Sequence, residues 1–386
     1  MTDTAAAVRD TARRAITVTP VRTSADRRAF IDLPFRLYRN DPTWIPPLKR
    51  DVAHLLAPEH PFYQHAQIEL FLARDPKGQI VGRIAAIKND SHNAQHHDKV
   101  GFFGFFETEN DQAVAGALFD AAATWLRARG LNVMRGPASP SVNDDYFGLL
   151  VDGFEWAPVV GMPYNPPTYA TLIERAGFAK AKDLIAYRHV SESGLPERVV
   201  RMADALAKRN KIVVRPLDLK DFTKEVERVR DIYNTAWEAN WGAIAMTDAE
   251  FGEVAKQFKP VVVPDLVAFG EVNGKLAGFA LALPDLNVVL KHMGGSLLPF
   301  GWAKFLWYGR KPPGLRVLTL GVLPEFRRTG VAELMYLAII KNGLARGMTY
   351  GESSWILEDN ALMRQSIEKI GGVAYKTYRL YDRAIG

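Results

Sequence analysis

The stretch from Arg316 to Leu344 constrains the fold of this chain more than any other, because it carries signals for a strand, a turn and a helix in that order. Its apolar, β-branched run from Val317 to Val322 is typical of a buried strand. Pro324 ends that run, and residues 327–332, RRTGVA, form a short basic turn before a helical pattern. Successive backbone amides at a helix N-terminus point at one place, so this order of elements predicts an anion site.

The pattern R-x-x-G-x-A after an apolar strand resembles the acyl-CoA pyrophosphate loop of the GCN5-related N-acetyltransferase (GNAT) superfamily. In that superfamily the turn amides hold the pyrophosphate, and a bulge in the preceding strand receives the thioester and pantetheine. The resemblance implies acyl-CoA as co-substrate, held by Leu320, Gly321, Val322, Arg327, Arg328, Thr329, Gly330, Val331, Ala332 and, further on, Asn360. The same residues also fit an ordinary connection between a strand and a helix with surface arginines, and Asn360 also fits a plain helix N-cap.

The strand and helix signals follow the GNAT order twice along the chain. In the first half we expect strands at 16–21, 68–73, 80–87, 100–107, 133–137 and 179–190, with helices at 24–38, 113–129 and 168–176. In the second half we expect strands at 212–216, 267–272, 276–283, 317–322, 350–355 and 375–381, with helices at 222–237, 247–258, from 331 onward and at 360–370. Asn165 lies twelve residues before Gly177, much as Asn360 lies eleven before Gly371, which indicates an internal duplication.

We therefore expect an α/β fold with mixed sheets in two tandem GNAT-like domains. Residues 1–15 are predicted to be a disordered N-terminus, 16–190 a degenerate first domain, 191–210 a linker that is itself a helix candidate, and 211–386 the acyl-CoA-binding domain. In the first domain the segment equivalent to the phosphate turn is 107–111, ETEND, which is acidic and would repel the phosphates of CoA. That domain is expected to have a structural or acceptor-shaping role.

Composition excludes several classes of function. The 386 residues contain no cysteine, which excludes disulfides, thiolate catalysis and cysteine-type zinc sites and is compatible with the cytoplasm. His92, His96 and His97 lie in a polar stretch without a carboxylate pattern, so no metal is expected. The net charge of +6 favours anionic ligands, but lysine and arginine are scattered, so nucleic acid is not an expected partner. No window is apolar enough to span a membrane.

An N-acyl transfer needs a neutral amine, a polarised carbonyl and an acid for the leaving thiolate. The superfamily often places a tyrosine acid seven residues after the asparagine that is here Asn360, but this chain has Ile367 there. Tyr378 is the predicted replacement, although it also fits a role in lining a strand. Glu352, on the strand beside the turn, is the predicted base, although an isolated carboxylate also fits a surface position.

Two aromatic segments are candidates for binding the acceptor. Trp237, Asn240 and Trp241 form an apolar slot with a polar handle, or else pack into the core. Residues 287–313 interrupt the second half with an aromatic insertion that has basic flanks and contains His292. This composition suits a membrane interface at the inner face of the cytoplasmic membrane or a long-chain lipid pocket, and packing between the domains is the alternative.

Three motifs carry a narrower resemblance, to the GNAT branch that includes bacterial ceramide synthases: DPTWIPP at 41–47, GFFGFFE at 101–107 and WEANWG at 237–242. This resemblance implies transfer of a fatty acyl group from acyl-CoA to the amine of a sphingoid base. The alternatives are an acetyl-CoA-dependent acetyltransferase of a small amine or amino acid, and a non-catalytic acyl-CoA-binding scaffold.

Overall fold

A computed structural model describes residues 16–141, 146–190, 195, 197–237, 241–297 and 300–386. The first half contains β1 (Thr17–Pro20), α2 (Ser24–Leu37), α3 (Lys49–Leu55), β2 (Ala66–Arg74), β3 (Ile80–Asn89), α4 (Asp90–His96), β4 (Val100–Thr108), α5 (Gln112–Arg127), β5 (Val133–Gly136), β6 (Leu149–Asp152), α6 (Thr168–Arg175) and β7 (Ala179–Val190). The expected disordered segment 1–15 lies outside the described residues.

The second half begins with a helix in the expected linker. Its elements are α7 (Glu197–Asn210), β8 (Ile212–Pro216), α8 (Phe222–Trp237), α9 (Asp248–Phe258), β9 (Val267–Val272), β10 (Lys275–Pro284), α10 (Asn287–Met293), α11 (Gly301–Tyr308), β11 (Gly314–Val322), α12 (Val331–Ala345), β12 (Tyr350–Leu357), α13 (Ala361–Lys369) and β13 (Val373–Ala384). Every strand and helix expected from the sequence is present. The sequence analysis missed α3, α4, β6, α10 and α11.

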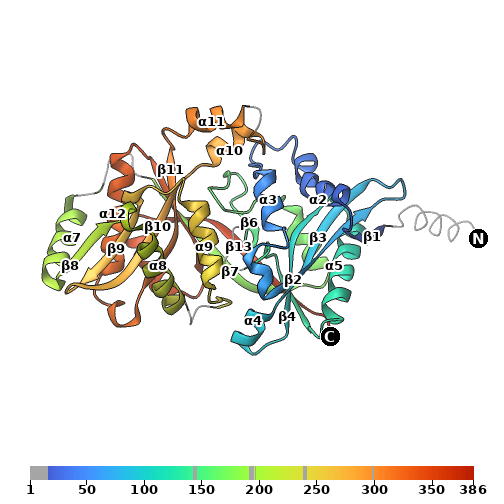
Figure 1. Ribbon diagram of the computed structural model, residues 1–386, viewed down its shortest axis with the longest axis horizontal. Helices are drawn as coiled ribbons and strands as arrows, with labels where there is room; N and C mark the ends of the chain where they lie inside the picture. The colour runs from blue at the N-terminus through green and yellow to red at the C-terminus, as the bar shows by residue number, and fades with distance from the viewer. Residues whose placement is uncertain (1–15, 142–145, 191–194, 196, 238–240, 298–299) are drawn as a thin grey trace, which may run out of the picture.

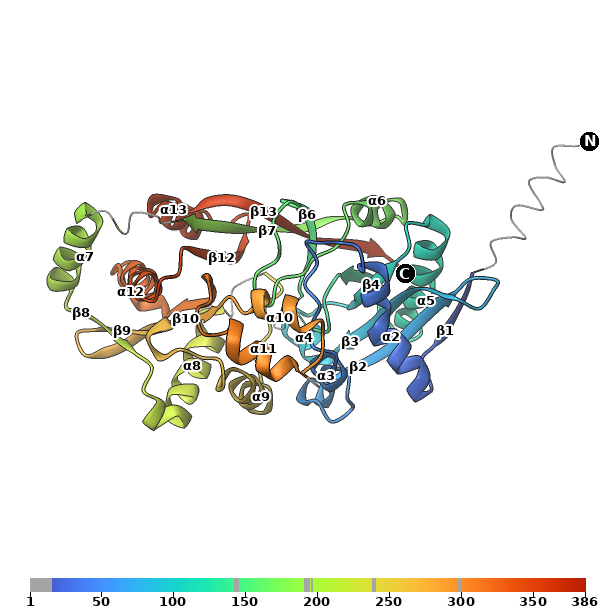
Figure 2. The same ribbon diagram turned by 90° about the horizontal axis from the view of Figure 1, so that it is seen from above.

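The last strands of the two halves are exchanged. Among the described residues one continuous mixed sheet has the order β1-β2-β3-β4-β5-β13-β7-β12-β11-β10-β9-β8, with β6 added beside β13. The first half's β7 therefore pairs with β12, and the second half's β13 pairs with β5. Figures 1 and 2 show β7 and β13 running side by side through the middle of the molecule. The expected domain division thus separates two parts of the chain, but both parts contribute to one sheet.

Helices cover the sheet on both faces in each half. In the second half, alternate residues of β9 point to opposite sides: Ala268 and Val272 pack beneath α12, whereas Val267 and Phe269 pack beneath α8. This alternation is what a strand buried on both faces requires. In the first half the buried core around Phe103 and Phe119 joins α5 to the sheet. The two cores hold the two ends of the sheet rigid around its centre.

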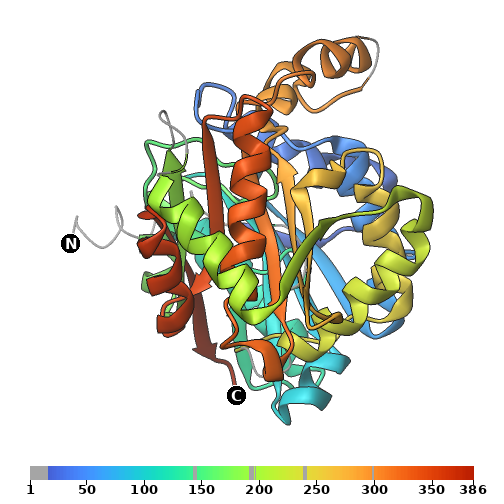
Figure 3. The ribbon, with the colours of Figure 1, turned by 90° about the vertical axis from the view of Figure 1, so that its left-hand side faces the viewer.

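The aromatic insertion forms α10 and α11. It contacts the first half, because Lys291 Nζ donates to the carbonyl of Pro42 over 2.7 Å and the amide of Lys49 donates to the carbonyl of Gly295 over 3.1 Å. Beyond that contact, α11 carries its apolar side chains outward, and Figure 3 shows the orange pair of helices projecting from the body. None of the described helices has both the length and the hydropathy needed to cross a bilayer.

Candidate active site

The paired strands β11 and β12 separate partway along their length. The two strands pair in parallel only from Gly314 and Tyr350 to Val317 and Ser353. Beyond that point β12 continues beside β7 and β11 continues beside β10, so residues 318–322 have no paired strand on the β12 side within the described residues. A register shift against β10 leaves Leu318 as an extra residue in β11. Such a bulge breaks the ladder and leaves backbone groups available to a ligand.

The turn after β11 leaves the N-terminus of α12 uncapped. Gly330, the N-cap residue, has φ +87°, the left-handed conformation that glycine adopts without strain, and has no side chain to cap the helix. The amides of the first helical turn therefore have no intrahelical partner. The amide of Val331 donates to Thr329 Oγ1 over 3.4 Å. Arg327 anchors the turn to α8 by donating to the carbonyl of Ala236 over 3.2 Å, while Arg328 remains exposed. Free amides and exposed guanidinium charge at a helix N-terminus make an anion site.

The equivalent place in the first half is closed. Asp111 caps α5, its carboxylate accepting from the amide of Ala113 over 2.8 Å. The gap between β4 and β5 is filled by the chain itself, since the amide of Ala138 donates to the carbonyl of Phe103 over 2.8 Å. A Cβ added to Gly104 would lie 1.8 Å from the carbonyl oxygen of Ala138, which shows how closely the two segments approach. The first half lacks the phosphate turn, as its sequence predicts.

Near the centre of the sheet lie the buried Glu352 and Tyr378 and the half-buried Tyr375. Only 1% of Glu352 is exposed, the hydroxyl of Tyr375 donates to its Oε2, and its Oε1 has no partner among the described residues. Burial, reinforced by the charge of Glu352, raises the pKa of Tyr375. Burial also raises the pKa of Tyr378, whose hydroxyl is likewise without a partner in the described part of the chain. Both phenols therefore remain protonated hydrogen-bond donors at neutral pH.

A segment of the first half forms one wall of this cluster. The carbonyl of Val160 accepts from Arg316 Nη1 over 2.8 Å, and the amide of Val160 donates to Asp285 over 3.1 Å. The hydroxyl of Tyr350 also donates to Asp285, and burial raises the pKa of that carboxyl. Lys376 Nζ donates to the carbonyl of Ala157 over 2.9 Å. Burial lowers the pKa of Lys376 to about 8.

The sequence analysis missed Arg316, Asp285 and Lys376 as members of this cluster. A signal was present only for Lys376, which alternates with Tyr378 and Leu380 in the predicted strand 375–381; Asp285 and Arg316 lie just outside the predicted strands. Each is less than 4% exposed. Charges are rarely buried that deeply without a partner, so such positions mark polar networks.

The other predicted residues lie in separate places. Asn360 is the N-cap of α13, its Oδ1 accepting from the amide of Met363 over 3.2 Å. Trp241 lies against the first half, with the guanidinium of Arg135 4.7 Å from its ring centroid. His292 stacks on Tyr308 in the insertion, the two ring centroids being 4.0 Å apart.

For two further predicted residues the structure does not describe the side chain. Asn240 lies outside the described residues, and only the backbone of Trp237 is described, at the end of α8. No group of three or more His, Cys, Asp or Glu side chains suited to a metal is found in the part of the chain that the structure describes.

Relatives of known name match nearly the whole chain. The bacterial ceramide synthase of Caulobacter vibrioides is 38% identical over 97% of this chain and 99% of its own length. The chain belongs to the family of that protein. Protein YghO of Escherichia coli is 35% identical over 93% of both chains. No protein-family model matches the sequence.

Solved structures confirm the fold of this member of the ceramide synthase family. A tandem GNAT protein from the clavulanic acid biosynthesis pathway superposes with a TM-score of 0.54 over 96% of this chain and 99% of its own, at 14% identity. A GCN5-related N-acetyltransferase from Sphaerobacter thermophilus gives 0.53 over 96% of each chain, at 11% identity. The expected tandem GNAT fold is therefore correct.

The buried ammonium of Lys376 yields a testable dependence of stability on pH. Its folded-state pKa of about 8 lies below the ordinary 10.5, so between these values the unfolded chain binds more protons and stability rises with pH. Relative to Lys376→Met, the free energy of unfolding of the unsubstituted protein should rise by up to about 3 kcal/mol from pH 8 to 10.5. Urea titrations at several pH values measure this difference. Lys369→Met, at an exposed position, is the control. A difference in free energy of unfolding between the unsubstituted protein and Lys376→Met that does not change with pH would contradict the burial argument.

Proposed function

We propose that this protein is an acyl-CoA-dependent N-acyltransferase that transfers a fatty acyl group to the amine of a sphingoid base. The observation that carries the proposal is the uncapped N-terminus of α12 at the end of the open edge of β11, beside the buried Glu352. The name of the Caulobacter relative supports the ceramide-forming version of the reaction.

In this proposal the phosphates of CoA bind at residues 327–332, with Asn360 as a further contact, and the pantetheine arm follows the free edge of β11. Backbone groups of Leu320 and Val322 hold the thioester, and an amide of this edge stabilises the oxyanion that forms at the carbonyl carbon. A backbone donor held rigidly in a sheet costs little reorganisation at the moment of reaction. The proposal uses the part of the sheet where β11 lacks a neighbouring strand.

The chemistry requires two proton movements. The C–N bond forms as the amine attacks, and the amine proton passes to the unpartnered oxygen of Glu352 as general base. The C–S bond then breaks, and the departing sulfur takes a proton, with the hydroxyl of Tyr378 as the donor that faces it. Because the pKa of Tyr378 is raised, this phenol is protonated at the start of each cycle. Trp237, Asn240 and Trp241 remain the proposed border of the acceptor site.

The protein should meet its lipid substrate at the inner face of the cytoplasmic membrane, through α11 and the adjoining residues. The exposed fractions of Phe300 and Trp307 are both 71%, and that of Leu306 is 59%. Lys304, Arg310 and Lys311 belong to the same segment. Exposed aromatic side chains with basic neighbours suit binding to an anionic lipid surface. Each basic residue near such a surface contributes about 1 kcal/mol to the free energy of binding.

Membrane contact predicts binding to vesicles of phosphatidylglycerol and phosphatidylethanolamine. The double substitution Leu306→Glu and Trp307→Glu should lower vesicle binding about tenfold or more, because it replaces apolar area with like-signed charge against anionic lipid. Co-sedimentation measures the bound fraction. Leu362→Glu is the matched control, since Leu362 is 83% exposed but lies on α13. Equal binding of the double variant and the control would rule out contact through α11.

The reaction itself is tested by release of free thiol from palmitoyl-CoA and acetyl-CoA in mild detergent, each with sphinganine, 3-ketosphinganine or spermidine. We expect release only from palmitoyl-CoA and only with a long-chain amine. Gly330→Asp should reduce it at least 100-fold, because a carboxylate at the helix N-terminus repels the phosphates. Gly330→Asn is the matched control: a Cβ at Gly330 would lie 2.5 Å from Leu206 Cδ2, and asparagine brings the same bulk to that contact without the charge.

The other outcomes separate the rival functions. Turnover only with acetyl-CoA and a soluble amine would assign a small-molecule acetyltransferase. CoA binding without thiol release from any of these pairs would assign an acyl-CoA-binding scaffold. Equal loss in Gly330→Asp and Gly330→Asn would trace the loss to the contact with Leu206 and contradict repulsion of phosphates at the turn.

A further inference from the structure

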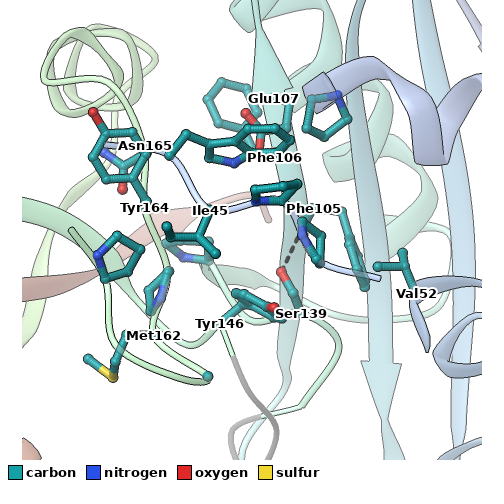
Figure 4. Close-up of a pocket in the computed structure, with 18 of the residues that line it drawn as sticks. Ile45, Val52, Phe105, Phe106, Glu107, Ser139, Tyr146, Met162, Tyr164 and Asn165 are labelled. Carbon is teal, nitrogen blue, oxygen red and sulfur yellow. Dashed lines mark hydrogen bonds between the residues drawn. The ribbon is translucent and has the colours of Figure 1, made fainter. Parts of the chain in front are cut away.

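The first half contains a cavity of about 130 Å³ that the proposed reaction has not used. It lies between β4, the loop at residues 44–47 and the segment from Pro158 to Asn165, and α10 of the second half borders it through Asn287 and Leu290. Figure 4 shows Ile45 in the middle of the ring of side chains, with Phe106 and Glu107 on one side and Ser139, Tyr146 and Met162 on the other.

Most polar groups around this cavity are engaged by the protein. The exception is buried Arg83: its Nη1 donates to the carbonyl of Phe30 over 2.6 Å, but its Nε has no partner among the described residues. The hydroxyl of Ser139 accepts from the amide of Phe105 over 2.8 Å, and the hydroxyl of Tyr164 donates to Asp41 over 2.7 Å. Glu107 Oε2 accepts from both Tyr38 and Tyr169, over 2.6 and 3.0 Å. The remaining lining is mostly aliphatic, aromatic or proline. An apolar guest therefore suits this space better than a polar one.

The size of the cavity suits part of a hydrocarbon chain. An engineered apolar cavity of about 150 Å³ stays dry and takes up benzene, a molecule of six carbons. The space here is only slightly smaller, so a few methylene groups at the end of a chain would fill it. Filling it would also supply the packing contacts that the lining lacks at present.

The cavity borders both the reaction centre and the aromatic insertion. Pro158, Gly161 and Met162 line it, while Val160 of the same segment contacts Arg316 and Asp285. Asn287 lines it as well, and its side chain donates to the carbonyl of Pro158 over 2.6 Å. One short segment therefore separates the cavity from the buried cluster, and α10, which borders the cavity, precedes the exposed α11 in the chain.

We propose that this cavity is a subsite for a long alkyl chain of a substrate. The proposal rests on the proposed N-acyl transfer and assigns the first half a binding function in place of the CoA site it lacks. Both substrates of that reaction carry such a chain: the fatty acyl thioester and the long-chain amine. The chemistry recognised is the same in either case, and the experiment distinguishes the two sources.

Two substitutions fill the cavity from opposite walls, Leu290→Trp from α10 and Ile45→Trp from the loop. Val288→Trp is the matched control, because Val288 lies on the same helix but is 38% exposed and does not line the cavity. Thermal unfolding of all three variants checks that they fold. Each methylene group excluded from an apolar site should weaken binding about fourfold, so excluding two or three lowers affinity by tenfold or more.

Calorimetric titrations with dodecylamine and lauroyl-CoA, against butylamine and acetyl-CoA, measure binding without turnover. The subsite is supported if the affinity of both filled variants for one long-chain ligand falls tenfold or more while their affinity for the short ligands is kept. The affinities of Val288→Trp should be unchanged. The ligand that is lost identifies the source of the chain. Unchanged affinity of both filled variants for both long-chain ligands would overturn the proposal, as would an absence of long-chain binding to the unsubstituted protein.

Turnover separates this result from the proposed function. If the unsubstituted protein releases no thiol with any amine, the proposed reaction fails, but the titrations still decide the subsite. If turnover is present, kcat/KM along series of acyl-CoA and amine chain lengths should fall in Leu290→Trp only for long members of one series. An equal fall for short and long members would show a general defect and contradict the subsite.

Discussion

The exchange of the last strands is the constraint on which the rest of the structure depends. β7 and β13 lie next to each other at the centre of the sheet, and Arg379 of β13 holds Asp183 of β7 through two hydrogen bonds of 2.7 and 3.0 Å. After Ser353, β12 continues beside β7 of the first half, so it diverges from β11. Because β7 also lies between β12 and β13, the cluster of Glu352 with Tyr375, Lys376 and Tyr378 forms only when both halves are folded together.

Two halves with the same order of elements have diverged at one position. The helix after the fourth strand of each half begins with a different group: Gly330 leaves the amides of α12 free, whereas the carboxylate of Asp111 caps α5. One half thereby has the features of the proposed anion site, and the described part of the other half lacks them. The first half also fills the gap between its strands with residues near Ala138, and its remaining apolar cavity lies under the loop at 44–47. Divergence of these local features between two similar halves would account for the proposed CoA site in one half and the proposed alkyl-chain subsite in the other.

The sequence predicts local structure well because periodicity and glycine position act locally. The alternation of apolar residues located the strands, and Gly330 after an apolar strand identified the turn. The exchange of strands was not predictable in this way, because β7 and β13 each follow a helix and a left-handed glycine, and nothing in either strand specifies which neighbour it will pair with.

For the candidate site, too, local features were predictable from the sequence and long-range contacts were not. Glu352 and Tyr378 were predicted from the sequence, but the contacts of the neighbouring Lys376 and Arg316 with Ala157 and Val160 depend on a loop of the other half. A loop without periodicity carries no signal for its position in space. Trp241 was expected beside the acceptor. Its ring lies against Arg135 of the first half, a residue 106 positions away along the chain, and nothing local in the sequence signals that contact.

The central claim is that one half binds CoA and the other does not, although both have the same fold. Calorimetric titration of the intact, unsubstituted protein with CoA tests it most directly, because the stoichiometry is independent of the acceptor and of turnover. The structure predicts one CoA for each chain. Two CoA molecules for each chain would show that the capped helix α5 also binds phosphate and would contradict the assignment of the two halves.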